Sequence, residues 1–289
     1  MIRKNYPNWM LAPGLLIFLL LFVVPSAGSF YYAFTNWTGI GSFRWIGLDN
    51  FRTLLDTDDT LLALRNTFLF TIVTTLLKIG LGLALALFVN RKLKTAVYLR
   101  SVLFFPAILS GIAVALAFTA ILHPDQGILN QTLRFLHLDG WANNWLTDRG
   151  IVMYAVSFVE VWKWAGFHMV LFLAGLQTIP GDMYESSTID GASKAQQLRY
   201  ITLPLIRPVL NANLLFSIIG GLKVFEIVYG LTGGGPGNAS VVLNVLIFKS
   251  YAQGRLGEAT AANLILFLLV TMLVLALNKL LGRREEEHA

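Results

Sequence analysis

The sequence contains no cysteine among its 289 residues. This absence excludes disulfide bonds, thiol nucleophiles and metal sites built from thiolates. Histidine is also scarce, because the four histidines are scattered and no two of them have the spacing of an H-E-x-x-H zinc motif. No catalytic site and no metal site are predicted for this chain, and it is not expected to be an enzyme.

Charged residues are few. They make up 13% of the chain, whereas hydrophobic residues make up 56%. A soluble domain carries about 25% charged residues. The low charge and the positive mean hydropathy of +0.65 therefore predict a protein embedded in a lipid bilayer. The net charge of +6 fits a basic membrane protein and requires no nucleic acid partner.

A phosphate-binding loop of the form G-x-x-x-x-G-K-[S/T] is missing as well. The glycine-rich stretch from Gly233 to Gly237 lacks the lysine that such a loop needs. No cofactor is therefore expected in this chain. If ATP drives the protein, ATP and Mg²⁺ bind to another subunit.

Six hydrophobic runs are long enough to cross a hydrocarbon core of about 30 Å. The first is too long for a signal peptide and has no clean cleavage site after it, so it is expected to remain as a span. We predict an all-α, polytopic membrane protein with six transmembrane helices, in which residues 1–289 form a single domain. The predicted spans are 11–34, 66–90, 99–122, 151–175, 207–230 and 259–281.

The distribution of Lys and Arg predicts the orientation. With six spans both termini lie on one side of the membrane, and that side holds 12 of the 22 cations: Arg3, Lys4, Arg91, Lys92, Lys94, Arg100, Lys194, Arg199, Arg207, Lys279, Arg283 and Arg284. The opposite side holds seven: Arg44, Arg52, Arg65, Arg134, Arg149, Lys249 and Arg255. By the positive-inside rule, both termini are predicted to be cytoplasmic.

A polar segment, Glu185 to Pro204, stands out between two hydrophobic runs. Asp182 followed by Glu185 fits a capping box at a helix start. Gly191 is expected to end that first helix, because glycine readily adopts the left-handed conformation found there.

A second helix is predicted directly after the glycine. Ser193 followed by Gln196 is another capping signal, and Pro204 is expected to stop the helix that follows. Residues 180–206 are thus predicted to form a short helix-turn-helix that is held out of the bilayer for a partner.

The same segment resembles a known motif. Glu185-Ser186-Ser187, then Gly191, then Ile201-Thr202-Leu203-Pro204 is similar to the EAA loop of ABC importer permeases, although that family mostly has alanine where Ser186 and Ser187 stand. Asp190-Gly191-Ala192 matches the D-G-A of the branch that imports sugars. The segment Leu231–Gly237 resembles the L-T-x-G-G-P turn of that branch, whereas residues 1–149 match the family only in hydropathy.

The resemblance implies a complex and a location. The complex contains a homologous second permease, two ATP-hydrolysing nucleotide-binding subunits and an extracytoplasmic solute-binding protein that delivers the sugar, in the cytoplasmic (inner) membrane of a prokaryote. The residues expected to dock an ATPase subunit are Glu185, Ser186, Ser187, Asp190, Gly191, Ala192 and Pro204.

Ionisable residues inside the spans are the first candidates for contact with a solute, because a charge at membrane depth is costly and faces a cavity or another charge. Glu160 with Lys163, and Lys223 with Glu226, are each spaced i, i+3, so mutual neutralisation on one helix face is as probable as contact with solute. Lys78 has no obvious partner in its own span and is expected to pair with Glu160 or Glu226.

Aromatic and small residues near these charges are the second set of candidates. Aromatic rings can pack against the C–H faces of a sugar, but the same residue types also close-pack membrane helices, and the sequence alone favours packing. In the resembled family, the spans before and after the loop hold the solute near mid-membrane. The resemblance therefore favours a substrate pathway of Glu160, Lys163, Trp164, Phe167, Ser217, Gly221, Val224 and Phe225.

The predicted function is that of a permease subunit of an ATP-driven importer, which carries a sugar such as an oligosaccharide or glycoside. Glycerol 3-phosphate or another polar solute is the alternative within the same class. From a different class, an ion-coupled secondary transporter could use Glu160, Glu226 and Lys78 as a relay, but the inverted repeats typical of such proteins are not visible. A polytopic membrane enzyme is weakened by the missing catalytic constellation.

Overall fold

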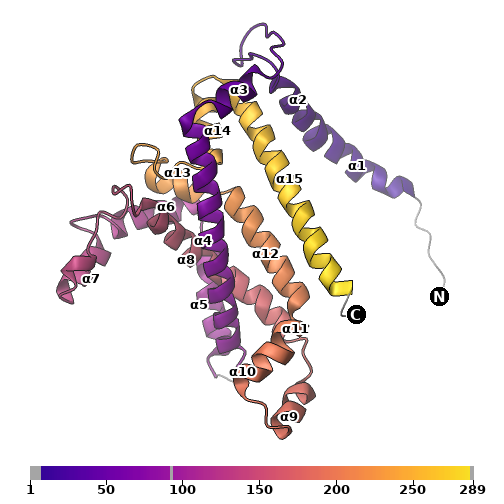
Figure 1. Ribbon diagram of the computed structural model, residues 1–289, viewed down its shortest axis with the longest axis vertical. Helices are drawn as coiled ribbons and strands as arrows, with labels where there is room; N and C mark the ends of the chain where they lie inside the picture. The colour runs from indigo at the N-terminus through magenta and orange to yellow at the C-terminus, as the bar shows by residue number, and fades with distance from the viewer. Residues whose placement is uncertain (1–7, 92–93, 287–289) are drawn as a thin grey trace. The chain divides into compact units, whose positions relative to one another are not determined.

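The computed structural model describes residues 8–91 and 94–286 (Figure 1). Helices joined by loops make up this described part, and its extended pairing is limited to an isolated bridge between Thr35 and Trp45. The all-α prediction is confirmed. Three of the cations used for the orientation, Arg3, Lys4 and Lys92, lie outside the described residues.

Contacts between residues divide the chain into two compact units. The first consists of Met1–Thr60 with Leu246–Leu268, and the second of Leu61–Val245 with Leu269–Ala289. The residues with predicted functions all lie in the second unit. The assignment of residues 1–289 to a single domain stays a prediction.

Four helical segments are long and apolar enough to cross a membrane alone. The first, Trp9–Tyr32, joins η1 (Asn8–Leu11), α1 (Ala12–Phe18), η2 (Leu19–Val23) and α2 (Val24–Tyr32). The others are α4 (Asp58–Val89), α8 (Val152–Leu176) and residues Leu256–Leu281 of α15 (Leu256–Glu286). Two bent helix pairs, Ala96–Ile108 with Gly111–Ile121 and Lys194–Leu205 with Arg207–Leu222, pass the same test, so the number of spans reaches the predicted six if each pair is one span.

The third predicted span, 99–122, is not one straight helix. It consists of α5 (Ala96–Ile108) and α6 (Gly111–Ile121), which meet at 97°. Pro106 near the end of α5 has no N–H to donate to the preceding turn, and Leu109 then adopts an extended conformation with φ −71° and ψ 146°. The helix therefore breaks, and α6 starts in a new direction.

The fifth predicted span, 207–230, is also broken. Helix α12 (Arg207–Leu222) ends after 16 residues, and α13 (Glu226–Thr232) begins after a non-helical stretch, Lys223–Phe225. The break frees the Lys223 carbonyl, which accepts a hydrogen bond from the Asn244 amide at 2.7 Å. Because 16 residues cover only about 24 Å, α12 alone falls short of the hydrocarbon thickness.

The first unit contains the first span, α3 (Asp49–Leu55) and the first part of α15. Ala33, Leu54, Ala261 and Ala262 form its buried core. Asn50 fixes the loop after α2, because its buried side-chain amide donates to the carbonyls of Ala33 at 2.9 Å and Thr35 at 2.8 Å.

The second unit is built around α8, whose spanning part is 67% buried. One of its buried hydrophobic clusters contains Ala86 and Val89 of α4, Met169 and Phe172 of α8, and Ile206. Because α8 is surrounded by other helices, its polar side chains face protein rather than lipid. Short helices connect the longer ones: α7 (Ile128–Phe135), η3 (Asp139–Trp141) and α14 (Leu243–Ala252), the last of which crosses into the first unit.

Candidate functional site

The predicted helix-turn-helix is formed by α9 (Gly181–Ile189) and α10 (Lys194–Gln197) (Figure 1). Gly191 follows α9 with φ +83°, a conformation that strains residues with a side chain. Its N–H donates to Thr188 O at 3.1 Å, and the Ala192 N–H donates to Ser187 O at 2.9 Å. These two bonds form a Schellman motif, so the prediction that Gly191 ends the first helix is confirmed.

One of the two predicted capping boxes is present. The Gln196 N–H donates to the Ser193 hydroxyl at 3.4 Å, and the Ser193 N–H donates to Gln196 Oε1 at 2.7 Å. The box predicted for Asp182 and Glu185 is wrong, since α9 starts at Gly181 without a side-chain cap. Pro180, with φ −61° and ψ 136°, starts the helix earlier and leaves Asp182 inside its first turn.

The helical segment that begins at Lys194 ends at Leu205, one residue after Pro204, which agrees with the prediction that this proline stops the second helix. After α10 the chain continues through a π-helical turn, η4 (Leu198–Thr202), and α11 (Leu203–Leu205). The Leu203 N–H donates to the Leu198 carbonyl five residues back, and this wider turn accommodates the proline ring, which would clash in a regular α-helix. The chain bends by 73° only at Ile206, where α12 follows.

Most of the predicted docking residues are accessible. Glu185, Ser186, Asp190, Gly191 and Pro204 are exposed, whereas Ser187 and Ala192 are half-buried. Sequence reasoning missed Ile189, which is 86% exposed at the end of α9 beside Asp190. An apolar residue within a polar hairpin was the available signal, because an exposed isoleucine next to a carboxylate gives a partner both a pocket-filling group and a charge.

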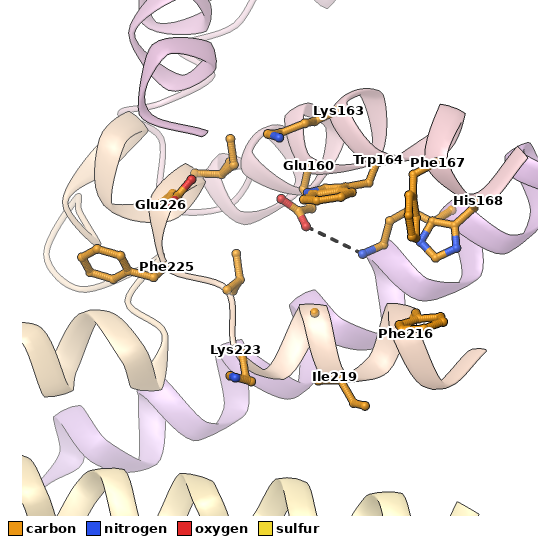
Figure 2. A pocket seen from close by; sticks show the side chains of 14 residues that line it. Glu160, Lys163, Trp164, Phe167, His168, Phe216, Ile219, Lys223, Phe225 and Glu226 are labelled. Carbon is orange, nitrogen blue, oxygen red and sulfur yellow. Dashed lines mark ion pairs between the residues drawn. The ribbon is translucent and has the colours of Figure 1, made fainter. Parts of the chain in front are cut away.

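A cavity of about 690 Å³ lies in the second unit between α4, α8, α12 and α13 (Figure 2). It is lined by Lys78, Glu160, Lys163, Trp164, Phe167, His168, Phe216, Ile219, Gly220, Lys223, Val224, Phe225, Glu226 and Ile227. Figure 2 labels side chains of this lining from α8 (Glu160, Lys163, Trp164, Phe167 and His168), from α12 (Phe216 and Ile219), from the break before α13 (Lys223 and Phe225) and from α13 (Glu226).

Six of the eight residues predicted for the substrate pathway line this cavity: Glu160, Lys163, Trp164, Phe167, Val224 and Phe225. Ser217 and Gly221 do not. The Ser217 hydroxyl donates to Thr75 Oγ1 on α4 at 3.0 Å, and a Cβ atom at Gly221 would lie 2.9 Å from Thr71 Cα. Both residues hold α12 against α4 and therefore face away from the cavity.

Charge pairing in the cavity connects different helices. Lys78 Nζ of α4 lies 3.7 Å from Glu160 Oε1 of α8, which is one of the two pairings expected for Lys78. Neither the Glu160–Lys163 pair within α8 nor the Lys223–Glu226 pair at the break before α13 forms an ion pair in the described part of the chain. Instead, Lys163 Nζ donates to Ala107 O at 3.2 Å and lies 4.4 Å from the centre of the Trp164 ring.

Aromatic rings form one wall of the cavity. The Trp164 and Phe167 rings meet edge to face with centres 5.7 Å apart, and the centre of Phe167 lies 6.3 Å from that of Phe216. Trp164 and Phe167 are half-buried, so parts of both rings remain accessible. Sequence reasoning missed Phe216, because it assigned the cavity to the face of α12 that holds the neighbouring Ser217.

Comparison with known proteins finds transport permeases that are similar to this chain over most of its length. Residues 78–287 match the family described as binding-protein-dependent transport system inner membrane component. The chain is 32% identical over 289 residues to the probable ABC transporter permease protein YurN of Bacillus subtilis, covering 99% of each chain. It is 34% identical over 262 residues to the trehalose/maltose transport system permease protein MalF of Thermococcus litoralis, covering 90% of this chain and 88% of that one.

A solved structure extends the similarity to the fold. The crystal structure of a bacterial ABC transporter involved in the import of the acidic polysaccharide alginate contains a chain that superposes with a TM-score of 0.84 at 28% identity, covering 96% of both chains. The resemblance found in the loop around Gly191 is confirmed by these matches, and its relatives include sugar permeases. This chain thus belongs to the family of binding-protein-dependent transport system inner membrane components, as a multi-pass ABC transporter permease and not as an enzyme.

Proposed function

We propose that this permease conducts a sugar, an oligosaccharide or similar glycoside, through the cavity between α4, α8, α12 and α13. The observation that carries this proposal is the composition of the cavity, where accessible faces of Trp164 and Phe167 lie beside the charged groups of Glu160 and Lys163. Aromatic faces pack against the C–H surface of a sugar ring, and charged groups orient its hydroxyls.

The size of the cavity agrees with this assignment. Its volume of about 690 Å³ falls within the range of about 300–1,000 Å³ that ligand pockets occupy. A similar permease carries a name that refers to trehalose and maltose, and the structural relative belongs to an alginate importer. The shared class of solute is therefore a carbohydrate of more than one sugar ring.

The helix-turn-helix of α9 and α10 is assigned to the ATPase partner. Its exposed face combines the carboxylates of Glu185 and Asp190 with the apolar side chain of Ile189. In the complex we propose, two nucleotide-binding subunits carry ATP and Mg²⁺, a second permease completes the pathway, and an extracytoplasmic solute-binding protein delivers the sugar. Both termini and this helix-turn-helix lie on the cytoplasmic side.

The cavity assignment is tested by removing the rings. Trp164→Ala and Phe167→Ala are expected to lower uptake per assembled complex about fivefold, because each ring contributes on the order of 1 kcal/mol of contact to a bound sugar. Uptake is measured in proteoliposomes, with the solute-binding protein and the sugar that a ligand screen assigns to it.

The matched control is Leu173→Ala, since Leu173 lies on the same helix but in the buried core. This variant is expected to lower the yield of folded complex by creating a cavity in the core, with normal uptake per complex that does assemble. A parallel loss of assembly in all three variants would place the two rings in the packing core and contradict the proposed pathway.

A further inference from the structure

A buried glutamine lies beneath the predicted docking helix. Gln197, the last residue of α10, is only 3% exposed. Its side-chain Nε2 lies 2.9 Å from the hydroxyl of Ser187, 2.9 Å from that of Thr188 and 3.3 Å from the carbonyl of Tyr184, all three on α9. One side chain of α10 therefore contacts three residues of α9, at spacing i, i+3 and i+4 along one face.

The directions of these hydrogen bonds are determined by the neighbouring groups. The Ser187 hydroxyl donates to Tyr184 O at 2.9 Å, and the Thr188 hydroxyl donates to the same carbonyl at 2.7 Å. Each hydroxyl has a single hydrogen, so both must accept from the Gln197 amide. Lys194 Nζ donates to Gln197 Oε1 at 3.1 Å, which fixes the orientation of the amide.

A second link runs parallel to the first. The hydroxyl oxygens of Tyr184 on α9 and Thr202 on η4 lie 2.9 Å apart, and Thr202 Oγ1 donates to the backbone carbonyl of Gln197 at 3.3 Å. Thr202 is buried as well. These bonds tie α9 to the helical segment that continues through η4 and α11 into α12, one of the walls of the cavity.

Ser187 completes the contact from the side of α9. In this chain the Ser187 hydroxyl supplies one of the acceptors of Gln197, and an alanine would leave a buried N–H group with one partner fewer. Ser187 and Gln197 therefore act as a matched pair.

We propose that Gln197 is a positioning residue, which holds the docking helix α9 rigidly against the segment that leads to α12, so that movement of α9 reaches the cavity wall. The proposal rests on the proposed function, because it assumes that α9 docks an ATPase subunit. Without these bonds, α9 remains helical and exposed but can tilt independently of α12.

The test uses Gln197→Met, which keeps the length and the buried volume of the side chain and removes its hydrogen bonds. The assembled complex is expected to keep its basal ATP hydrolysis. Stimulation by the sugar-loaded solute-binding protein should fall severalfold, and the amides of α9 should exchange hydrogen about tenfold faster. The control is Gln177→Met, the same replacement at an exposed glutamine just after α8.

A double-mutant cycle with Ser187→Ala identifies the contact. The combined variant should be no worse than Gln197→Met alone, since both changes remove the same bond. If Gln197→Met does not assemble, Ser187→Ala/Thr188→Val removes both hydroxyl acceptors and is expected to reduce stimulation in the same way.

Two results are distinguishable from each other. Unchanged stimulation and unchanged exchange of the α9 amides in assembled variants would overturn the role of Gln197 alone. Absence of ATPase subunits from the purified wild-type complex would instead contradict the proposed function on which this role depends.

Discussion

At the scale of single residues, the ion pair between Lys78 and Glu160 neutralises two charges that are buried between α4 and α8. Lys78 is 2% exposed and Glu160 is 4% exposed, so neither charge has access to water beyond the cavity. An unpaired charge in such a place is far more costly than the pair itself. The pair therefore fixes where α4 lies against α8.

Removing one partner of this pair should destabilise the protein strongly. Lys78→Met leaves the Glu160 carboxylate without its partner and is expected to cost about 3–5 kcal/mol of unfolding free energy. The double variant Lys78→Met/Glu160→Met should recover most of that loss, because it leaves no uncompensated charge. Thermal unfolding of the detergent-purified protein measures both effects.

Lys163→Met provides the comparison for this pair. The Lys163 ammonium donates to the Ala107 carbonyl but forms no ion pair within the described residues, so its removal strands no opposite charge. A smaller loss than that of Lys78→Met is expected. A double variant as unstable as Lys78→Met would show that the loss does not come from an uncompensated Glu160 carboxylate.

The residue scale also shows where sequence reasoning reached its limit. The sequence indicated that Lys78 needs a partner on another helix, but choosing between Glu160 and Glu226 requires the rotation of both helices. Likewise, Ser217 and Phe216 differ by one position, which is about 100° around a helix. Both faces of α12 carry apolar or small residues, so periodicity could not tell the cavity from the α4 contact.

At the scale of elements, the turn at Gly191 sets the geometry of the helix-turn-helix. A Cβ atom at this position would meet no other atom within 4 Å, so the cost of a side chain comes from the φ of +83° alone. This cost is roughly 1 kcal/mol or more for most residues and is lower for asparagine.

The effect of a substitution at Gly191 on the binding of ATPase subunits should therefore depend on how well the new residue tolerates a positive φ. Gly191→Val is expected to shift the turn and lower the recovery of ATPase subunits on purification at least severalfold. Asparagine also has a side chain but tolerates the left-handed region, so the Gly191→Asn complex should retain most of its ATPase subunits on purification. Equal recovery with valine, asparagine and glycine would separate this turn from ATPase docking.

The elements were predictable in number but not in shape. Hydropathy gives six runs because each must replace water with lipid over a fixed thickness. It does not distinguish a straight helix from α5 and α6, since both of these helices are mainly apolar. Pro106 was the local signal for the break, whereas the π-helical turn before Pro204 has no signature in the sequence.

At the scale of the whole molecule, two independent properties of the sequence predicted the class of protein. The low charge predicted the membrane, and the loop around Gly191 predicted the permease family that the comparisons then showed. The identity of the solute was not predictable in the same way. It depends on how side chains from α4, α8, α12 and α13 are combined in one cavity, and these segments are far apart in the sequence.

The orientation in the membrane is the remaining prediction at this scale, and it rests on the excess of cations on one side, 12 against seven. Ser193 and Ser42 are both exposed, and they are assigned to the cytoplasmic and the outer side respectively. Each can be replaced by cysteine in a chain that has no cysteine of its own, so a single introduced thiol reports its position without background.

With a membrane-impermeant thiol reagent, Ser42→Cys is expected to be labelled in intact cells whose outer surface is accessible. Ser193→Cys should be labelled only after the membrane is opened, because the reagent cannot cross the hydrocarbon core. Ser193 caps α10 through its hydroxyl, so Lys194→Cys, next to it and also exposed, repeats the measurement with the capping box intact. Labelling of Ser193→Cys and Lys194→Cys in intact cells would show that the orientation is the opposite of the predicted one. Because ATP is hydrolysed in the cytoplasm, α9 could then no longer be the surface that contacts the ATPase subunit.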